Sequence, residues 1–151
     1  MLRIAQLVLV ASLAMTLFNT GFAKAQGTAA EAKAMLEKAV AAVKADKAKA
    51  IDMFNKGEGG FKDRDLYPFC FQISDGKAVA APERVRGQDV RTLKDPTGKA
   101  YGEDLYKAAS QEGTVNEVSY QFPKPGASTP SPKTSFVTKA GDLGCGVGIY
   151  K

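Results

Sequence analysis

Histidine is absent from all 151 residues of this sequence. It is the commonest general base and metal ligand, so its absence removes every Ser-His and Cys-His nucleophile pair. The only two cysteines, Cys70 and Cys145, lie far apart, which excludes a C-x-x-C redox motif and covalent haem attachment. A zinc site would have to be built from carboxylates, which argues against one. We therefore predict a protein that is not an enzyme and holds no metal or cofactor.

Long apolar runs are scarce as well, and the only one lies near the N-terminus. The segment "IAQLVLVASLAMTLF" follows the positively charged start "MLR" and precedes "AKA", which fits the A-x-A cleavage pattern. This order predicts a secretory signal peptide over residues 1–25, cleaved after Ala25, and hence a periplasmic or secreted protein. The alternative is an uncleaved membrane anchor, but Gln6 and Asn19 interrupt the apolar run.

The chain has only a small excess of charge of one sign. The chain has 21 basic and 16 acidic residues, and cleavage would remove two of the basic ones, Arg3 and Lys24. The remaining positive excess is too small and too scattered to predict nucleic-acid binding. The share of hydrophobic residues, 44%, is ordinary for a globular protein, and residues 26–151 are predicted to form a single domain.

The first part of this domain is predicted to be one long amphipathic helix over residues 28–56. It is rich in Ala, Lys and Glu, Thr28 and Glu31 can form a capping box, and the glycines of "GEGG" can end it. Its narrow apolar stripe is suited to a flat surface, such as a sheet or a partner helix, and consists of Leu36, Val40, Val43, Ala50 and Phe54.

The remainder, residues 66–151, reads as a sheet with a crossover. "YPFCFQIS" alternates with period two and leads through Asp75-Gly76 into a second short strand, as in a hairpin. Residues 83–112 form a connection with a short helix, and "TVNEVSYQF", "KTSFVTKA" and "LGCGVGIYK" read as three further strands. This order predicts an α+β fold with a five-stranded, mostly antiparallel sheet.

The last of these strands carries a comb of glycines, Gly144, Gly146 and Gly148. Their spacing is not that of a phosphate-binding loop, and no helix follows them. The glycines leave one face of the strand bare, so that another element can approach closely. We expect the alanine-rich helix to fill this face, with a ligand pocket as the second possibility.

The residues between the glycines include Cys145. An exported protein meets an oxidising compartment, so Cys70 and Cys145 can form a disulfide if the last strand lies beside "YPFCFQI". Two separate buried thiols acting as small hydrophobic groups are the alternative.

Four segments together resemble a known family: "DGKAVAAP", "VRGQDVRTLKDPTGKAYGEDL", "EGTVNEVSYQFPKP" and "PKTSFVTKAGDLGCGVGIYK". Their order and spacing are similar to those of a single Cache domain, the PAS-like extracytoplasmic sensor module of bacterial chemoreceptors and sensor kinases, here as a free-standing exported protein. The resemblance covers roughly residues 30–151. It implies a long N-terminal helix on one face of a five-stranded sheet and a small-molecule pocket on the other face.

The resemblance also implies which residues lie at the pocket. Matching the family's Y-x-W-x-x-P and P-K-x-S-Y-V patterns places Tyr120, Phe122, Lys133 and Phe136 at or near the ligand. Read on their own, Tyr120 and Phe122 could equally be core residues, and Lys133 a solvated lysine. The loop arginines Arg84 and Arg86 could clamp an anion or lie in solvent. We favour the solvated reading for the two arginines and keep Tyr120, Phe122, Lys133 and Phe136 as the candidate binding residues.

This sequence departs from the family pattern at several positions. Phe122 and Leu143 stand where the family has tryptophan, Phe136 where it has tyrosine, and Ala81-Pro82 where His-Pro is common. A carboxylate, an amino acid or a more apolar ligand are therefore all open. We predict a periplasmic small-molecule-binding protein that acts through a membrane receptor or sensor kinase. The alternative is a ligand-free module that forms a homodimer through the long helix.

Overall fold

The computed structural model describes residues 25–151, so the predicted signal peptide lies, except for Ala25, outside the described residues. The fold is α+β, as predicted. Two helices open the domain, α1 (Ala29–Ala45) and α2 (Lys47–Lys56). The hairpin of β1 (Pro68–Gln72) and β2 (Ala78–Ala80), the short 3-10 helix η1 (Val90–Thr92) and α3 (Tyr101–Ala108) follow. The chain then forms β3 (Asn116–Pro123), β4 (Pro130–Ala140) and β5 (Leu143–Tyr150).

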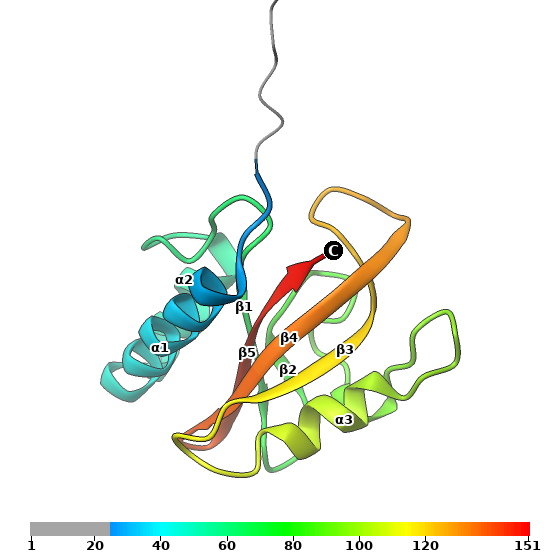
Figure 1. Cartoon of the computed structure of the whole chain (residues 1–151). Helices are drawn as coiled ribbons and strands as arrows, with labels where there is room; N and C mark the ends of the chain where they lie inside the picture. The colour runs from blue at the N-terminus through cyan, green and yellow to red at the C-terminus, as the bar shows by residue number, and fades with distance from the viewer. Residues whose placement is uncertain (1–24) are drawn as a thin grey trace, which may run out of the picture.

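The five strands form one sheet with the order β2-β1-β5-β4-β3. Every neighbouring pair is antiparallel. Figure 1 shows α1 and α2 packed on one face of this sheet and α3 on the other. The last strand in the sequence, β5, is the central strand in space, so its two faces look toward two different layers.

The predicted single long helix is interrupted at Asp46. This residue has an extended backbone (φ −157°, ψ 96°), and its side chain accepts a hydrogen bond of 3.0 Å from the backbone N–H of Lys49. Aspartate favours such a cap because its carboxylate competes for the free N–H groups at a helix start. The chain therefore forms α1 and α2 instead of one helix. The predicted capping box of Thr28 and Glu31 is present at the start of α1.

The glycine comb does not face α1, contrary to the favoured expectation. Leu143, Cys145 and Val147 pack against the buried side of α1, as period two requires. The glycines point to the opposite face. An added Cβ would meet Phe71 and Ala109 at Gly144, and Phe69 at Gly146. The glycines make room for the layer of large side chains on the α3 side of the sheet.

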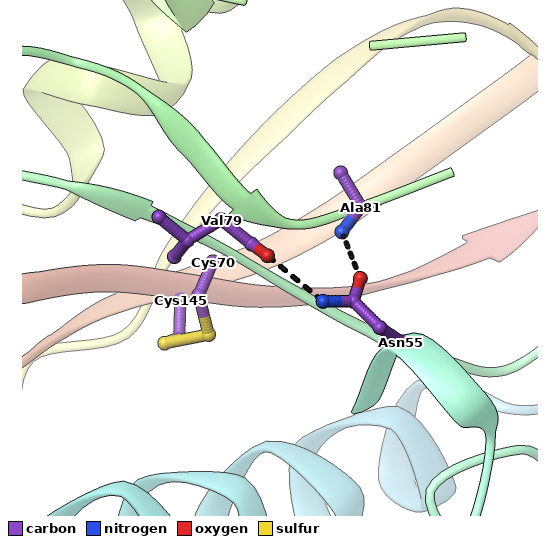
Figure 2. The surroundings of a disulfide bond; sticks show 5 residues. All are labelled: Asn55, Cys70, Val79, Ala81 and Cys145. Atoms are coloured by element: carbon purple, nitrogen blue, oxygen red, sulfur yellow. Dashed lines mark hydrogen bonds between the residues drawn. A yellow bond between two sulfur atoms is a disulfide. The ribbon is translucent and has the colours of Figure 1, made fainter. Parts of the chain in front are cut away.

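Of the two alternatives that the sequence left open, the structure contains the disulfide between Cys70 and Cys145. The two residues lie opposite each other in the register of β1 and β5, and both are almost completely buried under the helices. Beside this bond, the side chain of Asn55 at the end of α2 pairs with the edge strand β2 (Figure 2). Its amide donates to the carbonyl of Val79 (2.9 Å) and accepts from the N–H of Ala81 (3.3 Å). The end of α2 is thus attached to the edge of the sheet.

Candidate functional site

A small cavity of about 40 Å³ lies on the α3 side of the sheet. A cavity that holds one water molecule has a volume of roughly 10–15 Å³, so this cavity suits a ligand of only a few heavy atoms. The walls come from β1, β2, β3, β4, α3 and the loop that follows β2. Most of the lining is aliphatic or aromatic, and it includes Tyr67, Phe69, Val90, Tyr101, Leu105, Tyr120 and Phe122. A single charged side chain, that of Lys133, is part of it.

Lys133 is buried within a cage of aromatic rings. Only 2% of the residue is exposed, so the solvated-lysine alternative is wrong. The distance from Nζ to the ring centroid is 4.4 Å for Tyr67, 4.9 Å for Tyr150, 5.2 Å for Phe122 and 5.7 Å for Phe69. Ring faces are electron-rich and attract a cation. The cage therefore partly replaces the hydration that the ammonium group loses on burial.

A directed chain of hydrogen bonds starts at the same ammonium group. Lys133 Nζ donates to the hydroxyl of Tyr67 (2.9 Å), which lies 3.2 Å from the hydroxyl of Tyr150. The Tyr150 hydroxyl donates to the carbonyl of Pro123 (2.8 Å), so the proton between the two tyrosines belongs to Tyr67. An ammonium group has three N–H bonds, and the described residues accept only one of them. Two N–H bonds are left for a ligand.

The charge of Lys133 has no counter-charge in contact with it in the part of the chain that the structure describes. Burial lowers its pKa from 10.5 to about 7, and the charge of Asp65 opposes this shift. Burial also raises the pKa of Tyr67 and of Tyr150, so both phenols stay neutral beside it. A buried ammonium group is costly unless an anion pairs with it. An anion bound beside Lys133 would therefore stabilise the charged form of the lysine.

Tyr120 and Phe122, two of the residues that the family resemblance implied for the pocket, lie in the wall of this cavity. Tyr120 stacks on Tyr101 from α3, with ring centroids 4.4 Å apart and planes within 5°. Its hydroxyl forms a hydrogen bond of 2.9 Å with Ser135, and burial raises its pKa. Phe122 meets both tyrosine rings edge-on. The structure thus brings Tyr120, Phe122 and Lys133 together.

Phe136 lies on the other face of the sheet, which corrects its predicted position at the pocket. Its ring belongs to the core under α1, and the Nζ atom of Lys33 on that helix lies 4.8 Å from the ring centroid. Side chains alternate along a strand, so residues 133 and 136 of β4 must face opposite ways. The sequence alone therefore predicts that Lys133 and Phe136 face opposite sides of the sheet.

Several residues of the cavity and of the ring cage around Lys133 were not assigned to the site from the sequence. The alternation in "YPFCF" placed Tyr67 and Phe69 on one face, and this was the signal that could have found them. Tyr150 could have been found from pairing, because it lies opposite Lys133 in the register of β4 and β5. Tyr101 comes from α3 in the crossover, and no local pattern marks its contact with β3.

Comparison with known families gives a match to the family model "Single Cache domain 2" over residues 2–150. The chain belongs to the single Cache domain family. The resemblance seen in the sequence is thereby confirmed. Among curated proteins, the methyl-accepting chemotaxis protein McpP of Pseudomonas putida is 35% identical over 94 residues. That match covers 58% of this Cache domain chain and only 16% of the length of the relative.

Solved structures share the fold of this Cache domain. A methyl-accepting chemotaxis protein from Vibrio parahaemolyticus superposes with a TM-score of 0.63 at 22% identity, covering 80% of this chain and 86% of that one. A periplasmic sensor domain of a chemotaxis protein gives 0.61 at 24% identity, covering 78% and 86%. A Cache chemosensory domain described for its carboxylic acid recognition gives 0.57 at 24% identity, covering 78% and 84%.

Within residues 25–151, no helix combines the length and the apolar character that a membrane span needs.

Proposed function

We propose that this Cache domain is a non-enzymatic sensory module that binds a small monocarboxylate at Lys133. The observation that carries the proposal is the buried ammonium group with two free N–H bonds and no counter-charge in contact. A carboxylate would supply both the missing charge and two acceptor oxygens. The cavity volume of about 40 Å³ limits the ligand to a short chain, on the order of two to four carbons.

The same cavity disfavours the other two ligand classes that the sequence left open. An amino acid would bring a second ammonium group close to Lys133, and the cavity lining contains no carboxylate to pair with it. A purely apolar ligand would fill the space but leave the lysine without an anion. Both ligands therefore lose free energy that a monocarboxylate gains.

The proposed output passes through the helices to a membrane receptor or sensor kinase, with the domain outside the cytoplasmic membrane. A ligand can act only by binding two arrangements of the domain with different affinity. Asn55 attaches α2 to the edge strand at Val79 and Ala81, and Ala81 is itself part of the cavity wall. A change at that wall can therefore reach α2 through two hydrogen bonds. The chemotaxis relatives, which carry such domains, support this proposal.

The test is calorimetric titration of the exported protein with acetate, propionate and butyrate. Acetamide serves as the neutral isostere of acetate, and glycine represents amino acids. We expect saturable binding of at least one monocarboxylate, none of acetamide, and loss of binding in K133M with retained fold. Absence of binding for all three acids would overturn the proposal. A stable dimer in that case would favour the alternative, a ligand-free interaction module.

A further inference from the structure

A second and larger hollow of about 230 Å³ lies next to the Lys133 cavity. We call it the basic groove. It runs between the end of α2 with the loop that follows it, the 81–86 loop and the 123–126 loop. Four residues, Tyr67, Ala81, Pro82 and Phe122, line both the groove and the cavity. The two spaces are therefore separated by little more than these shared side chains.

The charge of the basic groove has one sign. Its lining contains five basic residues and no acidic one: Lys56, Lys62, Arg84, Arg86 and Lys124. Lys56 is paired with Asp52 at 2.7 Å. Within residues 25–151, no carboxylate forms an ion pair with any of the other four. Like charges that gather in a hollow with apolar walls focus a positive potential there.

Two arginines hold the wall between groove and cavity. Arg84 donates from Nη2 to the carbonyl of Ala127 (3.0 Å) and so links the loop after β2 to the loop after β3. Arg86 donates twice to the carbonyl of Ala81, at 3.1 and 2.9 Å. Each guanidinium has five N–H donors, so these bonds leave donors of both arginines free.

The ring of Phe122 lies between a cation of the basic groove and the cation of the cavity. The guanidinium carbon of Arg84 lies 5.8 Å from the centroid of this ring, and Nζ of Lys133 lies 5.2 Å from the same centroid. One aromatic ring thus contacts a cation of the groove and the cation of the cavity. An anion in the groove is already attracted toward Lys133.

From this arrangement we propose that the basic groove is an outer binding site for small organic anions and the entrance through which they reach Lys133. The outer site stands on the groove's own residues. Its role as an entrance rests on the proposed function. Two consequences follow from the charges. Anions should occupy the groove weakly and in a salt-sensitive way, and the groove should speed the association of carboxylates but not of neutral molecules.

The outer site is tested in K133M, which removes the inner site. Acetate is titrated into the labelled protein while backbone amide resonances are followed by NMR. We expect salt-sensitive shifts at Arg84, Arg86, Lys62 and Lys124, no such shifts with acetamide, and their loss when R84Q and R86Q are added. If acetate leaves the groove amides of K133M unchanged at low salt, the outer site does not exist. This result does not depend on whether wild type binds acetate at Lys133.

The entrance is tested with Lys133 in place. R84Q/R86Q is compared with K49Q/K94Q, a control that removes two exposed charges outside the groove. NMR line-shape analysis should show acetate association slowed by about tenfold in R84Q/R86Q at low salt, and little changed in the control. Equal association rates in the two variants would overturn the entrance role while leaving the inner site intact. Failure of the wild type to bind any monocarboxylate would overturn the proposed function instead, and with it the entrance role.

Discussion

Gly148 on β5 faces the side chain of Lys133 on β4. A Cβ atom added at position 148 would collide with Cε of Lys133 and with Oγ of Ser135. Gly148, the last glycine of the comb, therefore makes room for the one charged side chain of the cavity. Gly146 and Gly144 make room for Phe69 and Phe71, which belong to the same layer of side chains. The comb is therefore required by the side-chain layer on the α3 face of the sheet, not by the packing of α1.

We predict that G148A is destabilising and that the cost depends on Lys133. Overpacking of a tight core costs about 1–3 kcal/mol, since side chains must leave their preferred rotamers. In a K133A background much of the collision disappears, so the cost should fall by at least about 0.5 kcal/mol. Urea unfolding of wild type, both single variants and the double variant measures this coupling. Equal costs of G148A in the two backgrounds would contradict the contact.

We predict that the stability of the ligand-free protein rises with pH above 7, through Lys133. Burial lowers its folded pKa to about 7 from 10.5. Between these values the unfolded chain holds more protons on this group than the folded chain, so stability increases with pH. Below pH 7 both states are protonated and this dependence ends. The difference in unfolding free energy between wild type and K133M, followed from pH 6 to 10, isolates the effect, because the other groups cancel.

Carboxylate binding should have the opposite dependence on pH. The bound anion favours the protonated lysine, so affinity should fall as pH rises above 7, and binding at pH 8 should take up a proton. The neighbouring phenols of Tyr67 and Tyr150 stay neutral there because burial raises both pKa values. Calorimetry of acetate binding at pH 8 in buffers of different ionisation enthalpy measures the proton uptake. Binding enthalpies independent of the buffer would count against Lys133 as the group that pairs with the anion.

The sequence predicts the sheet well because its signals are local. Period two along "YPFCFQIS" and "LGCGVGIYK" separated Phe69 from Cys70 and Cys145 from the glycines, and the spacing of turns predicted five strands. The break at Asp46 was missed because a single polar residue within an alanine-rich run competes weakly in any propensity sum.

The site was harder to predict, because its residues meet only in three dimensions. Period two says which residues share a face but not which layer covers that face, and so the glycine comb was assigned to α1. The burial of Lys133 is decided by four rings, three from the strands β1, β3 and β5 and one from Tyr67 just before β1, and no sequence pattern records that convergence. The family resemblance pointed to Lys133, and the strand alternation could have removed Phe136.

We predict that C70A/C145A loses stability and keeps its ligand site. The disulfide joins residues 75 positions apart, and opening such a loop costs about 4 kcal/mol in the chain-entropy model. The disulfide belongs to the core under the helices and Lys133 points to the other face, although Cys70 also contributes to the cavity wall. Urea unfolding should therefore show a lower midpoint, while acetate affinity measured well below the transition changes by less than about threefold. An unchanged midpoint would contradict a stabilising role of the bond.

The last prediction concerns Asn55, which connects α2 to the edge strand. Substitution N55A leaves the carbonyl of Val79 and the N–H of Ala81 without their partner, at a cost of about 1–3 kcal/mol. N55D is the matched variant, because aspartate can still accept from Ala81 but cannot donate to Val79. Stability should therefore fall in both variants relative to wild type.

Hydrogen exchange then separates a structural role of Asn55 from one in transmission. In wild type we expect acetate to change the exchange of amides in α2, because Ala81 belongs both to the cavity wall and to the Asn55 contact. In N55A, acetate should still protect the amides around Lys133 but no longer affect those of α2. If acetate alters α2 equally in wild type and N55A, the signal reaches the helices by another route, such as the direct contacts between α1 and β5.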